Sequence, residues 1–329
     1  MSEHPTSRRL FIGGMLGAIG AVSATGAGLL ARPVLRQPKA RVTALRHRNY
    51  DSDLSKHLEE GIRRYPAVVH RVKDGRVVLK PNFVEFHEGR PINTDVRFVA
   101  ACVEAFRRLG ASEVLVGEGP GHLRDTEMLL EATGLGLLLK DVGAKFVDLN
   151  VDEGKKLVLP NNYSDMSHIA FAKTAVTADL LVSVAKMKTH HWAGATLTMK
   201  NLFGIVPSAI YGWPKNPLHW AGIQNCILDI WDAVRPGFGI VDGIVAMEGD
   251  GPIMGTARPM GAIFMGDNLP AVDAHVARMM GLIPERIPYL AVSRLYGGTL
   301  HPWRTDIEGD VIQAESFEMV PSLAHLQVK

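Results

Sequence analysis

The segment 185–204, AKMKTHHWAGATLTMKNLFG, concentrates side chains that could do chemistry. Three lysines, two histidines and an asparagine lie there, directly after an apolar run that we expect to form a buried strand. Cations that close together repel one another and are costly to remove from water. The cluster of Lys186, Lys188, His190 and Lys200 therefore indicates a site for an anion, or for a reaction that develops negative charge. The alternative is that these lysines only flank a strand and keep their ammonium groups in water.

Two shorter polar segments also begin where a predicted strand ends. Lys80 and Asn82 follow an apolar run, and Pro81 between them cannot donate a hydrogen bond to a sheet, so the chain should leave the sheet here. Glu118 lies in Gly-Glu-Gly-Pro-Gly after a second apolar run, and these glycines would let the backbone approach a ligand closely. Glu118 is thus a candidate ligand or base, although both segments also fit ordinary turns.

A glycine-rich segment, 242–255, holds three carboxylates: Asp242, Glu248 and Asp250. Carboxylate oxygens on a flexible backbone suit a hard divalent cation, so these three are the candidate metal ligands. The same acids could instead pair with the lysines in a polar network without metal. Asp267 and Asp273 rank below them, because an acid near a helix N-terminus is favoured by the helix dipole alone.

Strands and helices alternate along the chain from Arg41 onward, which predicts an α/β fold with a largely parallel central sheet and helices on both faces, as a single domain over residues 37–329. We expect strands at 41–45, 77–80, 113–117, 144–149, 180–184, 239–242 and 261–265, with 156–159 as hairpin partner of 144–149. The main expected helices are 53–65, 94–109, 125–133, 218–234 and 270–280.

Ligands of parallel α/β sheets bind at the carboxyl ends of the strands, so the four polar segments should meet on one rim. We predict that this rim binds an anionic small molecule. Neighbouring cations can lower the pKa of a lysine toward neutrality, which makes four residues candidates for catalysis: Lys80, Lys188, His190 and Lys200. The candidate binding residues are Asn82, Glu118, Lys186, Thr189 and Asn201. Adjacent histidines face opposite ways in an extended chain, and of His190 and His191 we place His190 in the site.

The first 36 residues are predicted to be a targeting segment. Ser-Arg-Arg-Leu-Phe-Ile at 7–12 opens into 22 uncharged residues, Leu10 to Ala31, and resembles a twin-arginine export signal. We therefore expect the twin-arginine translocation machinery as a partner, and a periplasmic location. A segment of this length could also span a bilayer, so the alternative is a membrane anchor that holds the protein facing the periplasm.

Composition excludes several classes of protein. Net charge is only +2, so no basic surface is available to neutralise nucleic-acid phosphates. The chain has 2 cysteines and no CxxC pair, so we expect neither an iron–sulfur cluster nor a structural zinc site. A divalent metal is one candidate cofactor, and the identity of any other is left open, although a twin-arginine signal favours a cofactor bound before export.

Several segments resemble the domain-of-unknown-function 362 family, over about Val77 to Gly281. They are Lys80-Pro-Asn, Ala185-Lys-Met-Lys-Thr-His, Met199-Lys-Asn-Leu-Phe-Gly-Ile-Val-Pro, Asp242-Gly-Ile, Glu248-Gly-Asp-Gly-Pro and Gly266-Asp-Asn-Leu-Pro-Ala-Val-Asp. The family carries no established reaction, so the resemblance implies a site without naming its chemistry. The leading interpretation is an exported enzyme acting on an anion. The alternatives are a non-catalytic periplasmic protein that binds an anion or cofactor, and a redox accessory protein without its own iron–sulfur ligands.

Overall fold

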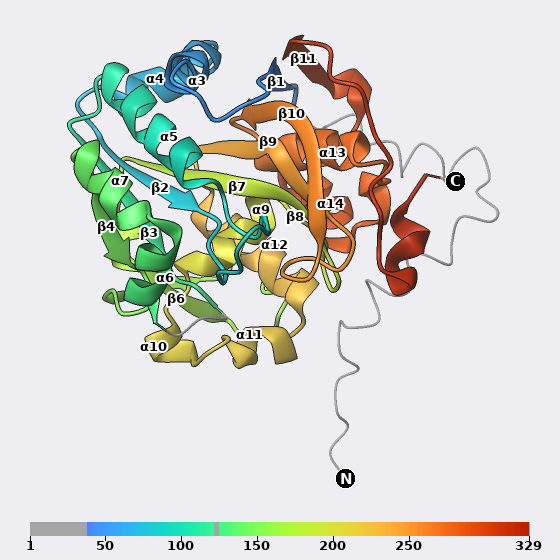
Figure 1. The fold of residues 1–329 in the computed structure, drawn as a ribbon. Coiled ribbons are helices and arrows are strands. Elements are labelled where there is room, and N and C mark those ends of the chain that lie inside the picture. Colours follow the sequence, from blue (N-terminus) through green and yellow to red (C-terminus); the bar gives the residue numbers. More distant parts are fainter. Residues whose placement is uncertain (1–37, 122–124, 329) are drawn as a thin grey trace, which may run out of the picture.

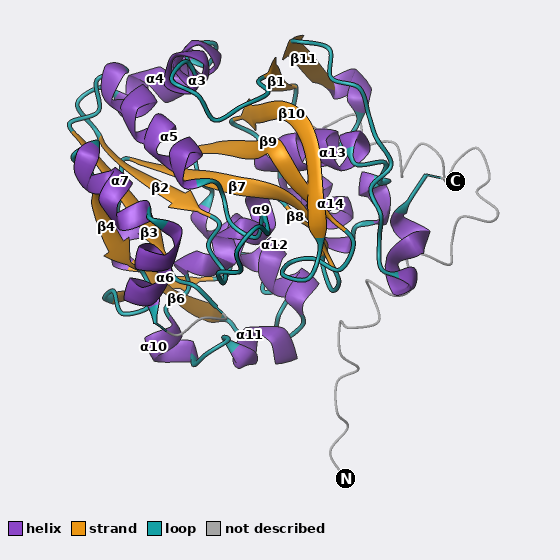
Figure 2. Ribbon diagram, viewed as in Figure 1, coloured by secondary structure: helices purple, strands orange, loops and turns teal. Residues whose placement is uncertain are grey.

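A computed structural model describes residues 38–121 and 125–328, and the predicted targeting segment lies outside them. Its centre is a nine-stranded sheet of order β11-β1-β10-β9-β7-β2-β3-β4, with β8 paired to β7 (Figures 1 and 2). The strands are β1 (Ala40–Arg46), β2 (Arg76–Pro81), β3 (Glu113–Glu118), β4 (Lys145–Asp148), β7 (Leu180–His190), β8 (Gly194–Thr196), β9 (Phe238–Glu248), β10 (Thr256–Gly266) and β11 (Thr305–Gly309).

The five strands from β9 to β4 all run parallel to one another. β10 is antiparallel to both β9 and β1, and β1 is parallel to β11. The predicted α/β fold with a largely parallel sheet is therefore confirmed. The carboxyl ends of β2 and β3 lie side by side and next to the middle of β7, since Lys80 of β2 pairs in register with Ser183 of β7 and Leu79 with Val116 of β3.

Both faces of the sheet are covered by helices, because successive residues of each strand point to opposite faces and both sets are apolar. Val77 and Leu79 pack in one hydrophobic cluster, whereas Val78 packs in the other. The first cluster is covered by α3 (Leu54–Ile62), α4 (Pro66–Val72), α5 (Val96–Arg108), α6 (Thr126–Thr133) and α7 (Leu135–Asp141), seen together in Figure 1. The second is covered by α8 (Lys173–Val176), α9 (Thr198–Asn201), α11 (Asn216–Trp220), α12 (Ile223–Val234), α13 (Leu269–Met279) and α14 (Pro288–Ser293).

Two expectations about individual elements were wrong. The segment 156–159 does not form a hairpin with β4: β5 (Gly154–Val158) pairs with β6 (His168–Ala172) in a separate two-stranded sheet. The helix expected over 218–234 is split into α11 and α12, because Gly222 has a φ of 101° that no helix accommodates. The tail after Arg304 contains β11 and short 3₁₀ turns, as the sequence indicates.

Strands β7 and β9 are each longer than predicted, and this changes the setting of the polar segments. β7 continues through the basic segment to His190, because β8 and β9 supply hydrogen-bonding partners on its two sides, with Lys188 opposite Thr196 and Met247. β9 continues to Glu248, paired with β10. The lysines and acids expected in loops after the strands thus lie mostly within the strands, where their side chains are held by the sheet.

Candidate functional site

A buried ion pair joins the first two polar segments. Lys80 Nζ lies 2.6 Å from Glu118 Oε2, and each residue is 1% exposed. Glu118 also accepts hydrogen bonds from the backbone amides of Phe83 at 2.9 Å and Gly119 at 2.8 Å. Burial lowers the pKa of Lys80, and the adjacent Glu118 carboxylate partly offsets this effect. These three donors occupy both oxygens of the Glu118 carboxylate, which thereby connects the ends of β2 and β3.

Asn201, on α9, connects this ion pair to the basic segment. Its Oδ1 accepts from Lys80 Nζ at 2.7 Å, and its Nδ2 donates to Lys80 O at 2.9 Å and to Ser183 Oγ at 3.0 Å. The backbone at residue 204 packs so closely against Glu118 that only glycine fits there, because a Cβ on Gly204 would clash with Glu118 Oε1. Gly119 is equally confined, with a Cβ 2.6 Å from Gly204 O. These glycines bring two backbones together around one ion pair.

Lys186 and Asp242 form a second buried ion pair, between β7 and β9. Lys186 Nζ lies 2.8 Å from Asp242 Oδ2, and the Tyr50 hydroxyl donates to Asp242 Oδ1 at 2.9 Å. The backbone amides of Asp95 and Ile244 also donate to this carboxylate. Lys186 and Asp242 therefore neutralise each other, as the sequence-based alternative of a polar network allowed.

Lys188 is buried without a carboxylate. Its Nζ donates to Ile92 O at 2.6 Å and to Pro252 O at 3.3 Å, which ties together the loops that follow β2 and β9. Burial, and then the positive charges of Lys200, Lys186 and Lys80, hold the pKa of Lys188 well below its ordinary value of 10.5. Lys188 thus has a clear role in packing these loops.

Lys200 differs from the other lysines of the cluster. Its ammonium lies 4.2 Å from the centroid of the Phe203 ring, and within the described part of the chain it forms no hydrogen bond or ion pair. Burial, followed by the charge of Lys80, lowers its pKa to about 7, against the opposing effect of Glu118. Lys200 as a residue is partly exposed, although its ammonium is buried enough for its pKa to fall. It is the cation most available to a ligand.

His190 is buried and organises the turn between β7 and β8. Its Nδ1 lies 3.1 Å from the amide of Trp192 and 3.3 Å from that of Ala193, so Nδ1 is the acceptor and the ring proton is on Nε2. Burial and the neighbouring Lys200 hold its pKa well below 6.5, so the ring is neutral. His191 is part-exposed, with Nδ1 3.3 Å from Asp250 Oδ1. The two rings thus lie in different environments.

The three predicted metal ligands serve separate partners. Asp242 pairs with Lys186, whereas Glu248 lies 3.5 Å from Arg258 Nη1 and accepts from the amide of Glu318. Asp250 is next to His191 on the loop after β9, where Thr189 Oγ1 donates to Gly249 O at 2.9 Å. Across residues 38–121 and 125–328, His, Cys, Asp and Glu form no group of three or more suited to a metal ion. In the described residues the three acids make three separate contacts, and their role as metal ligands stays a prediction.

Two residues near the site escaped the sequence analysis. Lys215 is 2% exposed and donates from Nζ to Gly119 O at 2.7 Å and to Phe203 O at 3.3 Å. Burial lowers its pKa to about 7. It stands in a Trp-Pro-Lys-Asn-Pro loop that has no recognisable motif, although a lysine between two prolines was a usable signal.

The second is Asp273, which was ranked low because it lies near a helix start. Its carboxylate accepts from Thr198 N at 2.8 Å, Thr198 Oγ1 at 2.5 Å and Met199 N at 2.9 Å. Since α9 begins at Thr198, Asp273 fixes the amino end of the short helix that carries Lys200 and Asn201. Burial raises its pKa to about 7.

Asn82 contributes an unused polar atom to the same rim. It is 7% exposed, and its Oδ1 has no hydrogen-bond partner. Buried polar atoms are nearly always paired in native proteins, so an unpaired one deserves a cause. Asn82 is two residues from Lys80 and follows the last residue of β2, which places it beside the Lys80–Glu118 pair. A ligand that donates a hydrogen bond would satisfy it.

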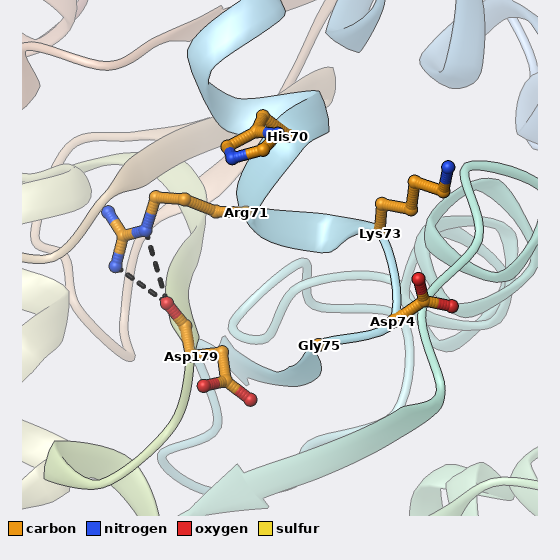
Figure 3. Close-up of a pocket in the computed structure, with 6 residues that line it drawn as sticks. All are labelled: His70, Arg71, Lys73, Asp74, Gly75 and Asp179. Carbon is orange, nitrogen blue, oxygen red and sulfur yellow. Dashed lines mark hydrogen bonds between the residues drawn. The ribbon is translucent and has the colours of Figure 1, made fainter.

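A shallow surface pocket of about 350 Å³ lies at the opposite edge of the sheet (Figure 3). It is lined by His70, Arg71, Lys73, Asp74, Gly75 and Asp179. Gly75 immediately precedes β2 and Asp179 immediately precedes β7, so this pocket is at the amino ends of strands whose carboxyl ends carry the site. Arg71 donates to Asp179 O at 3.1 and 2.7 Å, which closes part of it. It is separate from the rim.

Comparison with known proteins agrees with these motifs. The chain matches the family described as "Domain of unknown function (DUF362)" over residues 77–278. It belongs to this family. A DUF362 match of this extent covers every segment of the rim described above. A curated relative, Thylakoid-associated protein sll1697 of Synechocystis sp., is 27% identical over 267 residues, which cover 78% of this chain and 79% of the relative.

Two solved structures show a more distant likeness. One is the lactate racemase apoprotein from Thermoanaerobacterium thermosaccharolyticum, with 17% identity and a TM-score of 0.42. The other is a protein of Thermotoga maritima, with 12% identity and a TM-score of 0.41. They match 68% and 74% of this DUF362 chain, which spans only 54% and 58% of their own lengths.

Proposed function

We propose that the rim at the carboxyl ends of β2 and β3, beside β7, binds an anionic small molecule, with Lys200 as its main contact. The observation that carries the proposal is the pairing of charges. The Glu118 carboxylate already accepts hydrogen bonds from Lys80 and from two backbone amides. Lys200 has no carboxylate partner in the described residues. A small anion would supply the missing charge, and charge-assisted hydrogen bonds are the stronger ones in proteins.

The other residues of the cluster support this role by position. Lys80, Asn201 and Asp273 fix α9, and hence the base of the Lys200 side chain. Lys188 and Lys215 belong to the same cluster, since burial and then the charges of neighbouring lysines lower the pKa of each. Asn82 Oδ1 offers an acceptor for a hydroxyl or amine on the same ligand. A ligand with an acid group and a nearby donor would match both.

The pH dependence of anion binding tests this proposal. Sulfate is a suitable probe because it stays dianionic near neutrality. Lys200 has a pKa of about 7, so its amine is mostly protonated below pH 7 and mostly neutral above it. We expect sulfate affinity, measured by isothermal titration calorimetry, to fall by about tenfold per pH unit above pH 7, as proton linkage requires. An affinity that is flat from pH 6 to pH 9 would contradict the assignment of Lys200.

In the absence of an anion, the lowered pKa of Lys200 should also make the stability of the protein depend on pH, and this dependence serves as a control. Lys200 and Lys215 each have a folded-state pKa lowered from 10.5 to about 7. Between these two values the unfolded chain binds more protons than the folded one, so the free energy of unfolding should rise with pH across this window. Saturating sulfate should flatten that rise, because a bound anion keeps Lys200 protonated.

A second candidate function is catalysis at the same site. A lysine whose pKa is near 7 can give up and take back a proton at neutral pH, which is what a general acid or base requires. Lys80 is less available for this role, because Glu118 and Asn201 occupy its ammonium. Native mass spectrometry of protein purified from its own cells, before and after incubation, would show whether a co-purified ligand changes in mass. A ligand that stays unchanged favours a binding protein.

We further propose that the protein works outside the cytoplasm, because of its twin-arginine sequence at residues 7–12. A relative named thylakoid-associated is compatible with a place at a membrane. Residues 38–121 and 125–328 contain no helix that is both long enough and apolar enough to span a bilayer. Changing Arg8 and Arg9 to lysine should retain the protein in the cytoplasm, as measured by cell fractionation. Unaltered export of that variant would refute the twin-arginine route.

A further inference from the structure

A row of aromatic rings leads away from Lys200. Its ammonium lies over the Phe203 ring at 4.2 Å. The Phe203 centroid is 5.7 Å from that of His219, and His219 is in turn 5.7 Å from Trp192. The His219–Trp192 contact is edge-on, with 68° between the ring planes. Trp192 in the turn between β7 and β8, Phe203 in the 3₁₀ turn after α9, and His219 on α11 therefore form a row of three rings that begins at Lys200.

Trp192 is the outermost ring, and its side chain is 60% exposed. Its backbone is nevertheless held firmly, because its amide donates to His190 Nδ1 at 3.1 Å and its carbonyl accepts from Gln224 Nε2 at 3.1 Å. His191 packs edge-on against the indole from the other side, at 4.9 Å and 83°. An exposed indole on a fixed turn is costly to leave in water, and tryptophan faces of this kind are typical of binding surfaces.

We propose that the anion bound at Lys200 carries a planar aromatic ring, which stacks on Trp192 and contacts His219. The inference rests on the proposed anion site and adds the chemical class of the ligand. Offset or edge-to-face contact with aromatic rings is favoured beyond the burial of apolar area. The acid group would lie at Lys200, and the ring would extend from it along Phe203 and His219 toward the indole.

A sugar ring is the main alternative partner of an exposed indole, but it also needs polar groups for its hydroxyls. The polar atoms that the structure describes around Trp192 are largely occupied. His190 Nδ1 accepts two amides, Gln224 Nε2 donates to Trp192 O, and His219 Nδ1 contacts Lys215 O. An aromatic acid needs fewer such partners, so it fits this surface better.

The test compares three phosphate probes by isothermal titration calorimetry at pH 6.5: inorganic phosphate, phenyl phosphate and cyclohexyl phosphate. We expect phenyl phosphate to bind at least tenfold more tightly than inorganic phosphate, and at least threefold more tightly than cyclohexyl phosphate. In Trp192→Ala the ratio between phenyl and inorganic phosphate should fall to within about twofold, whereas Trp192→Phe should keep most of it. Trp303→Ala is the matched control, because Trp303 is 69% exposed, stacks on His301, and lies on the 3₁₀ turn Pro302–Arg304.

The possible results separate the two proposals. If inorganic phosphate binds but phenyl phosphate gains nothing, or if Trp192→Ala keeps the full preference, the aromatic ligand is refuted and the anion site stands. If phenyl and cyclohexyl phosphate bind equally, the contact is apolar burial rather than ring stacking, and the inference also fails. If none of the three probes binds, the anion site itself is refuted together with its ligand class.

Discussion

Replacing Glu118 with glutamine is expected to lower the free energy of unfolding by about 3–5 kcal/mol, the range seen when one partner of a buried ion pair is removed. Lys80 and Glu118 are 2.6 Å apart and each is 1% exposed, so the substitution leaves a lysine in the interior with neutral acceptors and no carboxylate to balance its charge. A neutral amide also accepts more weakly than a carboxylate from the amides of Phe83 and Gly119. Urea denaturation measures the change.

The chain offers a matched control for this substitution. Glu153 lies 2.6 Å from Lys173 in an ion pair of the same length, but their side chains are 69% and 50% exposed. Water screens that pair, so Glu153→Gln should change stability by less than about 1 kcal/mol. Equal effects at the two positions would mean that the Lys80–Glu118 pair does not hold the rim together. Adding Lys80→Met to Glu118→Gln should recover part of the loss, because it removes the unpaired charge.

The pattern of apolar runs was sufficient to predict the layers of the fold and the place of the rim. Val77–Leu79 and Val114–Val116 are apolar at every position, and Leu180–Val184 at every position but Ser183, which is typical of strands covered on both faces. Such strands are parallel in most proteins, and their carboxyl ends then meet at one edge. This reasoning placed Lys80, Glu118 and Asn201 near one another, and the structure joins them by hydrogen bonds.

The pairing within the rim could not be predicted in the same way. Whether Asp242 binds a metal or a lysine depends on the register between β7 and β9, which sets Lys186 directly beside it. A sequence shows that acids and lysines are present, but their partners follow from strand order. Lys188 illustrates the same limit, because its partners are the backbone carbonyl groups of Ile92 and Pro252. Every residue has such a carbonyl, so the sequence does not indicate which ones a lysine will contact.

Residues that act through backbone contacts were the hardest to find. Asp273 fixes α9 by accepting from two amides and a hydroxyl of a segment about 75 residues earlier, and nothing in its own neighbourhood indicates this. Lys215 reaches Gly119 O and Phe203 O from a loop of its own. Both contacts arise from tertiary packing, so only the assembled fold reveals them.

Replacing Lys200 with methionine should weaken sulfate binding at pH 6.5 by about 10- to 100-fold, the range expected for losing a hydrogen bond to a charged group. The fold should be unaffected, because among the described residues the Lys200 ammonium forms no hydrogen bond or ion pair and lies over the Phe203 ring, on which a methionine side chain can also pack. Calorimetry measures the affinity, and urea denaturation measures the stability. The matched control is Lys56→Met, on the exposed side of α3 across the sheet.

Stability and affinity should therefore separate in Lys200→Met, whereas they should fall together in Glu118→Gln. The two substitutions act on neighbouring charges, but one charge is part of the structure and the other is available to a ligand. If Lys200→Met bound sulfate as tightly as the parent protein, then Lys188 or Lys215 would have to be the anion's partner. Both are already bound to backbone carbonyls, so an anion there would first have to displace those contacts.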